Sequence, residues 1–172
     1  MAARYNANAM MILFYRLLSG EDASEQYLGW LRAEAPVLGA HLPQTVADLR
    51  ADILKRQQVI LGNDGADLDA LGLYGIFADL LHCGNIQLRL RGPRRHGRVE
   101  VGILVDPDYR NKGIATAAHR WAIRRLTEAG FNKLSASFVV DNVAAQALYQ
   151  GLGFQLEGVL RRDELVGDQY HD

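Results

Sequence analysis

The sequence predicts a single α/β domain in which helices flank a twisted, mixed β-sheet. Apolar and polar residues alternate from Val99 to Val105, the period of a strand with one buried face. Two further alternating segments, Leu71 to Ala78 and Asn85 to Leu90, suit an antiparallel meander with a turn near His82 to Gly84. From Ile114 the apolar residues recur at helical spacing, so a helix follows the strand.

Length and composition set limits on the function. The 172 residues suit one domain, residues 1–172, with residues 1–9 expected to form a flexible tail. A formal charge of −1 gives no reason to expect a nucleic-acid or membrane partner, and no apolar run is long enough to span a bilayer, so we expect a cytoplasmic enzyme. The single cysteine, Cys83, reads as a small apolar residue, and the five histidines lack metal-ligand spacing, so no metal is expected.

Two predicted helices form an arm before the meander. A first strand is expected at Met11 to Leu18, followed by a helix from Glu21 to Ala33. Thr45, with Asp48 three residues later, approximates a capping box that opens the second helix. The polar, turn-rich segment from Gly62 to Asp69 ends the arm.

The turn after Val105 has the composition of a phosphate site. Pro107 ends the strand, and Gly113 and Ala115 leave little side chain over the start of the next helix. Unpaired amides at a helix N-terminus bind phosphate, and Arg110 and Lys112 add positive charge. The turn is neither a Walker A loop nor a dinucleotide fingerprint, and an ordinary glycine turn with solvated charges would share this pattern.

A second motif gives the first one its context. The segment from Asn142 to Phe154 reads NVAAQALYQGLGF. Together the two segments resemble the acetyl-CoA site of the GNAT superfamily of N-acetyltransferases, R/Q-x-x-G-x-G/A followed by N-x-x-A-x-x-L-Y-x-x-x-G-F. The first pattern is filled by Arg110, Gly113 and Ala115, and the second by Asn142, Ala145, Leu148, Tyr149, Gly153 and Phe154.

The resemblance implies a GNAT-like fold that binds acetyl-CoA. In the family the pantetheine arm lies between the strand at Val99 to Val105 and the next strand, here Lys133 to Val140, and backbone groups from Gly102 to Val105 hold it. The implied cofactor-binding residues are Leu104, Val105, Arg110, Lys112, Gly113, Ile114, Ala115, Thr116, Asn142, Ala145 and Leu148.

The resemblance also suggests the acid and leaves the base open. Tyr149 matches the family's general acid, and its phenol, with a reference pKa of about 10, is a suitable proton donor to a thiolate. A tyrosine packed in the core is the alternative. Ser137 stands where some members carry a glutamate, so we expect Glu100 to act as the base, with Glu34 in reserve. A structural role for Glu100 and a relay of waters remain open.

The acceptor is predicted from the helical arm. The segment from Tyr27 to Val37 resembles the opening of GNAT members that acetylate amino sugars, so a small-molecule amine, an amino sugar, is the expected acceptor. Tyr27, Trp30 and Glu34 are then candidate substrate contacts, although a tryptophan on a helix often lies in the core. A protein N-terminal amine is the nearest alternative, and a polyamine fits less well because the arm lacks a carboxylate cluster.

A basic segment precedes the predicted cofactor strand. It reads either as an electropositive lip for an anionic group, such as a nucleotide-linked sugar or the CoA 3′-phosphate, or as a solvated hairpin tip. A nucleic-acid site would need a larger basic face. The residues concerned are Arg89, Arg91, Arg94, Arg95, His96 and Arg98.

The C-terminal segment departs from the family pattern. Phe154 to Leu160 alternates like a strand, and Arg161 to Asp172 resembles the turn before one more closing strand, which we expect to be missing. An open sheet edge would favour a homodimer. The missing strand and Ser137 also allow a different class of protein, a catalytically inactive CoA-binding regulatory module.

Overall fold

The computed structural model describes residues 11–34, 42–61, 71–166 and 169–172. Five strands form the main sheet in the order β1-β2-β3-β4-β5. The first four pair antiparallel and β5 runs parallel to β4, so the predicted mixed sheet is confirmed. The strands are β1 (Leu13–Leu17), β2 (Gly72–Ala78), β3 (Leu81–Leu90), β4 (Arg98–Val105) and β5 (Lys133–Ser135).

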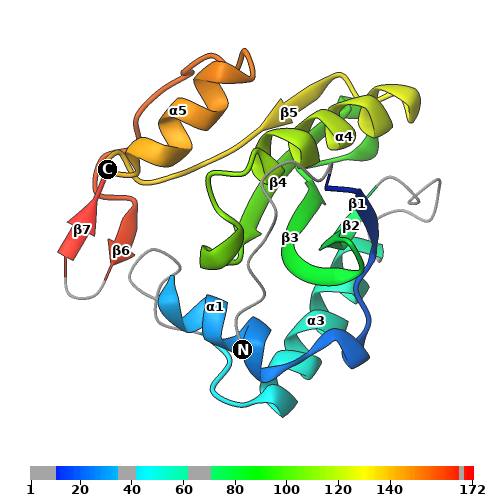
Figure 1. Ribbon diagram of the computed structural model, residues 1–172. Coiled ribbons are helices and arrows are strands. Elements are labelled where there is room, and N and C mark those ends of the chain that lie inside the picture. The colour runs from blue at the N-terminus through cyan, green and yellow to red at the C-terminus, as the bar shows by residue number, and fades with distance from the viewer. Residues whose placement is uncertain (1–10, 35–41, 62–70, 167–168) are drawn as a thin grey trace.

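Helices cover both faces of this sheet. Figure 1 shows α4 on one face and α1 with α3 on the other. Val99 and Val101 of β4 point toward α4 and share a core with Ile114 and Ala118. The opposite face packs on α1 and α3 through a second core that includes Leu28, Leu49, Ile53 and Phe77. The helices are α1 (Glu25–Ala33), α3 (Val46–Leu61), α4 (Ile114–Glu128) and α5 (Val143–Gly151).

Side-chain caps set where the two arm helices begin. The α1 helix begins at Glu25 rather than Glu21, because the Ser24 hydroxyl accepts the Tyr27 N–H at 3.2 Å and Gly20–Asp22 forms a separate 3₁₀ turn. The predicted capping box of α3 is confirmed. Thr45 N–H donates to Asp48 Oδ2 at 3.0 Å, and Asp48 N–H donates to the Thr45 hydroxyl at 3.1 Å.

The turn of the β2–β3 hairpin lies earlier than predicted. Asp79 and Leu80 both adopt left-handed backbone angles, with φ of 47° and 73°, as a two-residue hairpin turn requires. His82 to Gly84, where the turn was expected, belong to β3, next to an irregularity of the ladder between Ile76 and Phe77. The prediction failed because neither Asp-Leu nor its neighbours carry a typical turn glycine.

The C-terminal segment also differs from its prediction. Residues 154–160 form no strand, although their alternation suits one, because no strand among the described residues supplies them with ladder hydrogen bonds. In place of a bare turn, β6 (Glu164–Val166) and β7 (Gln169–His171) pair as a small antiparallel hairpin. Asp172, the residue after β7, lies beside the stretch that follows β5, because Val140 N–H donates to the Asp172 carbonyl at 3.0 Å.

Three of the predicted segments are not among the residues that the structure describes. The tail at residues 1–9, the end of the amino-sugar-like opening at 35–37 and the turn-rich segment 62–69 lie outside the described residues. Within the described ranges, no helix is long and apolar enough to cross a membrane.

Candidate active site

The start of α4 exposes backbone amides next to the end of β4. Asp106, 4% exposed, accepts the Asp108 N–H at 2.9 Å and so shapes the 3₁₀ turn Pro107–Tyr109. Gly113 is the N-cap of α4 with φ of 76°, and no side chain caps the first turn. A Cβ on Gly113 would meet no atom within 4 Å, so the space above these amides is open. The arrangement fits a phosphate group at the helix N-terminus.

The two cations of this loop brace it. The Arg110 guanidinium donates to the Val105 carbonyl at 3.1 Å and pairs with Glu34 at the end of α1. The Lys112 ammonium donates to the Asp108 carbonyl at 2.8 Å and lies 4.8 Å from the centre of the Tyr109 ring. Backbone amides and the helix dipole are therefore the groups best placed for a phosphate, and the side chains hold the loop in shape.

The strands β4 and β5 separate beside this loop. Their parallel ladder joins Arg98–Glu100 to Lys133–Ser135 and ends there. From Val101 to Val105, β4 pairs only with β3 among the described residues, which leaves the backbone groups of its other edge without a strand partner. Gly102 is exposed, and a Cβ built on it would meet no atom within 4 Å. An extended ligand can bond to such an edge as a strand does.

The second motif lies on α5. The side-chain oxygen of Asn142, Oδ1, accepts the Ala145 N–H at 3.0 Å, so Asn142 caps this helix and its side-chain NH2 group keeps its two donors. Leu148 is half-buried. Tyr149 is 7% exposed and stacks on Phe138 with 5.4 Å between ring centres. Burial raises the pKa of Tyr149 to about 12, so its phenol keeps its proton at neutral pH. Among the described residues no group bonds to its hydroxyl, so the proton is available to a ligand.

A buried histidine that the sequence analysis did not single out packs on Tyr149. His119 is fully buried and its ring lies edge-on to Tyr149, 5.3 Å between centres. Its Nδ1 lies 2.8 Å from the Ala115 carbonyl oxygen, which can only accept, so Nδ1 carries the proton and the Nε2 lone pair has no partner in the described structure. Burial lowers its pKa. Its place on the apolar face of α4, between Ala118 and Ala122, was the available signal.

The predicted base is held by two arginines. Glu100 pairs with Arg89, directly opposite on β3, and its Oε2 lies 3.7 Å from Arg91 Nε. Ser137 Oγ donates to the other carboxylate oxygen, Oε1, at 3.5 Å. Glu100 lies two residues before Gly102 and on the same face of β4, because side chains alternate along a strand. The structure thus brings Glu100 and Ser137 together with two cations that face the same carboxylate.

The candidate contacts of the arm are not equally open to a ligand. Tyr27 and Trp30 are 4% and 5% exposed and belong to the core under α1, packed against His82 and Phe77, so their surroundings are those of core residues. Glu34 is half-buried and is committed to Arg110. It therefore joins the arm to the loop between β4 and α4.

The basic hairpin divides in two. Arg94 donates to the Ala129 carbonyl at 2.8 Å and stacks over Phe131, 4.0 Å from the ring centre, so it fixes the hairpin to the end of α4. Arg95 and His96 are exposed at the tip. Arg89 and Arg91 instead face Glu100. The predicted lip would therefore consist of Arg89 and Arg91.

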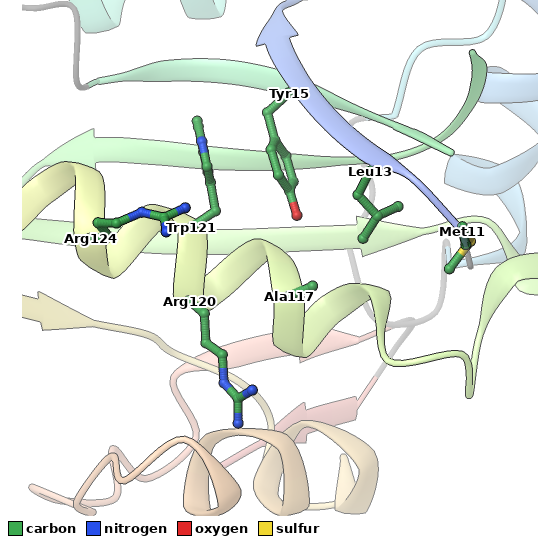
Figure 2. A pocket seen from close by; sticks show the side chains of 7 residues that line it. All are labelled: Met11, Leu13, Tyr15, Ala117, Arg120, Trp121 and Arg124. Atoms are coloured by element: carbon green, nitrogen blue, oxygen red, sulfur yellow. The ribbon is translucent and has the colours of Figure 1, made fainter. Parts of the chain in front are cut away.

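A pocket of about 360 Å³ lies elsewhere, between β1 and α4. Figure 2 shows Tyr15 stacked beside Trp121, with 4.5 Å between ring centres, while Arg120 points away from both rings. This pocket includes no residue of the two motifs. The site built by β4, α4 and α5 is thus separate from it.

Comparison with known proteins shows which family the chain belongs to. A model of the acetyltransferase (GNAT) family matches residues 60–154. The chain belongs to this family. The match covers the chain from β2 to α5 and therefore both motifs. The α1 helix lies outside the match, as does nearly all of α3. The predicted family is confirmed, and with it the family's cofactor, acetyl-CoA.

Relatives within the GNAT family differ in their acceptors. The chain is 33% identical over 78 residues to spermidine N(1)-acetyltransferase of Escherichia coli K12, covering 45% of this chain and 42% of that protein. It is 31% identical over 81 residues to the L-amino acid N-acetyltransferase AaaT of the same strain, covering 46% and 50%. The chain thus spans half or less of the curated relatives it matches.

A solved structure confirms the GNAT fold. The ribosomal L7/L12 alpha-N-protein acetyltransferase RimL, in complex with coenzyme A, superposes with a TM-score of 0.80 at 17% identity. The match covers 92% of this chain and 89% of RimL. At this identity the likeness concerns the fold alone.

Proposed function

We propose that this chain transfers the acetyl group of acetyl-CoA to a primary amine of a small molecule by direct attack in a ternary complex. The observation that carries the proposal is the junction of β4 and α4. There, open backbone amides at Gly113 lie beside a strand edge, Val101 to Val105, that has no strand partner among the described residues. Acetyl-CoA supplies the activated acetyl group when bound.

The chain's own residues then have distinct tasks. The amides of Gly113 to Thr116 hold the pyrophosphate, while backbone groups at Leu104 and Val105 and the Asn142 side-chain NH2 group hold the pantetheine arm. The amine must be neutral to attack, and Glu100 takes its proton, directly or through a water. The new N–C bond forms as the C–S bond breaks, and Tyr149 gives its proton to the departing thiolate.

We propose an amino sugar as the acceptor, on the resemblance of the Tyr27 to Val37 segment. A polyamine is the second candidate, because the Escherichia coli relative at 33% identity is a spermidine acetyltransferase. A protein N-terminal amine is the third. Two arginines beside Glu100 disfavour a polycation there, since they outnumber the carboxylate. A cytoplasmic location and a homodimer belong to the same proposal.

The test is an acetyl-CoA titration by calorimetry, followed by thiol release with amino sugars, polyamines and N-terminal peptides. Micromolar binding with thiol release on one class would support the proposal and name the acceptor class. Binding without turnover on any class would instead support the inactive CoA-binding module. No binding would contradict both.

A further inference from the structure

The face of the sheet that carries Glu100 has two different parts. Under α1 and α3 it is apolar, with Leu73, Phe77 and Leu104 in the second core. Toward the start of β4 it becomes polar. Gln87, Arg89 and Arg91 follow one another at alternate positions of β3 and its end, and Glu100 and Gly102 lie opposite on β4. Both arginines and Gly102 are exposed.

Positive charge exceeds negative charge in this polar part. One carboxylate, Glu100, faces the guanidinium groups of Arg89 and Arg91, and both approach the same oxygen, Oε2. The side chains of the arginines are 48% and 57% exposed, whereas that of Glu100 is 16% exposed. Each guanidinium has five N–H donors in a planar fork, so most of them remain for another acceptor. Donors of this geometry match carboxylate and phosphate groups.

We infer that the acceptor carries an anionic group beside its amine, and that Arg89 and Arg91 bind this group while Glu100 receives the amine. This inference rests on the proposed function. Each charged group of the acceptor then meets the opposite charge, because its ammonium group approaches the Glu100 carboxylate and its anionic group approaches the guanidinium groups. A carboxylate and a phosphate share this chemistry, so an α-amino acid and a phosphorylated amino sugar are the two acceptor types to compare.

The position relative to Gly102 supports the assignment. Two residues of a strand span roughly 7 Å, so an amine near Gly102 is within reach of Glu100 directly or through one water. The space above Gly102 is open, and the ladder between β4 and β5 ends at Glu100 and Ser135. The arginines therefore border the place where β4 becomes free to receive an extended ligand.

The experiment compares acceptors with and without the anionic group, and each rate is referred to the concentration of neutral amine because a nearby anion also raises the pKa of the amine. An α-amino acid is paired with its amide, and glucosamine 6-phosphate with glucosamine, and thiol release gives kcat/KM for each. We expect the anionic member of one pair to be preferred at least tenfold by the wild type. In Arg89→Gln this preference should fall at least fivefold, mainly through KM of the anionic acceptor. The ratio within a pair cancels any change in the basicity of Glu100, which both members share.

Arg95→Gln is the matched control, since Arg95 is exposed on the same hairpin and its loss changes the net charge equally. Its preference should stay within twofold of the wild type. Equal rates for both members of both pairs would overturn the inference and leave the proposed acetyl transfer intact. An equal loss of preference for the anionic acceptor in Arg89→Gln and Arg95→Gln would overturn it too, because the net positive charge of the hairpin would then explain the preference without a direct contact. If acetyl-CoA binds and no acceptor releases thiol, the proposed function itself fails.

Discussion

The two ends of β4 expose different kinds of chemical groups. At the C-terminal end, from Val105 to Gly113, the groups offered to a ligand are backbone amides, and side chains such as Arg110 brace the loop. At the N-terminal end, around Glu100, the groups are side chains contributed by β3, β4 and the stretch after β5. A backbone site needs only small residues in a fixed order, whereas a side-chain site depends on which residues face each other across strands. The first can be shared by a whole family while the second changes with the acceptor.

The backbone end can be tested by filling its open space. Replacing Gly113 with Trp should weaken acetyl-CoA binding on the order of 10³-fold, because two or more charge-assisted hydrogen bonds of about 1.5–3 kcal/mol each are lost. Calorimetric titration measures this. Gly130→Trp is the matched control, since Gly130 has the same φ of 76° and the same open surroundings at the other end of α4.

Both glycine variants force a non-glycine residue into the left-handed region, at a cost of about 1–2 kcal/mol. Their loss of stability should therefore be similar, and only Gly113→Trp should lose the cofactor. Wild-type affinity for acetyl-CoA in Gly113→Trp would place the phosphate site elsewhere. An equal loss of affinity in both variants would show that the loss comes from lower stability of the fold.

Replacing Tyr149 with Phe probes the proposed proton donor on α5. Turnover should fall by about 10²-fold, the usual contribution of one general acid, while acetyl-CoA affinity stays within twofold. Because the pKa of Tyr149 is raised to about 12, its loss should not remove any limb of the rate profile below pH 10. Single-turnover thiol release measures the chemical step.

Tyr15→Phe is the control for this variant. Burial also raises the pKa of Tyr15 to about 12, and its ring is stacked on Trp121, yet it lies on β1 away from both motifs. Turnover should be unchanged there. Equal turnover of Tyr149→Phe and the wild type would remove Tyr149 as the acid.

The side-chain end can be tested at its carboxylate. Glu100→Gln should lower kcat/KM at least tenfold near neutral pH and lose the acidic limb of the rate profile, because the amide cannot take a proton. The acceptor in this experiment carries no anionic group. The guanidinium groups of Arg89 and Arg91, which lose their carboxylate partner in Glu100→Gln, then do not change its binding. Glu34→Gln, which breaks the exposed pair with Arg110, should keep the limb. If Glu34→Gln loses the acidic limb instead, the general base is Glu34. If neither variant loses it, a relay of waters takes the proton.

The same contrast explains what the sequence could predict. Gly113, Asn142 and Tyr149 could be singled out as candidates from the sequence, because helix starts and helix caps constrain residue type at fixed spacing along one segment. The pair of Arg89 and Glu100 was not found as a pair, because it depends on the register between β3 and β4. The prediction of a strand at Phe154 to Leu160 failed for a related reason, since alternation shows a suitable strand and not the neighbour it needs.

The helical arm shows that a family motif can also suggest ligand contacts for residues that belong to the core. Tyr27 and Trp30 were candidate contacts because their spacing resembles a family opening, yet both are buried against β2 and β3. An amphipathic helix places its aromatic residues on the apolar face, and the sequence alone does not tell whether that face meets the core or a ligand. The turn at Asp79 and Leu80 was missed because its left-handed angles occur without glycine.

The smallest expected effects concern two histidines, the fully buried His119 and the half-buried His82. His119 packs on Tyr149 and His82 on Tyr27, and the Nε2 atom of each has no partner within the described ranges. Burial lowers the pKa of both below the value of about 6.5 in an unfolded chain. The unfolded state therefore binds more protons in acid, so the stability is fully present above about pH 6.5 and is lost as the pH falls toward the folded-state pKa.

Each histidine can account for at most about 1.4 kcal/mol of lost stability per pH unit in this window. Urea unfolding of the wild type, His119→Leu and His82→Phe at pH 7.5, 6.5 and 5.5 measures the slopes. Both variants should lose less stability than the wild type on acidification, and only His119→Leu should also change turnover, modestly, because its ring supports Tyr149. If both slopes match the wild type, the histidines are not the source of acid sensitivity. If His82→Phe lowers turnover more than His119→Leu does, the contact of His119 with Tyr149 is not what limits turnover.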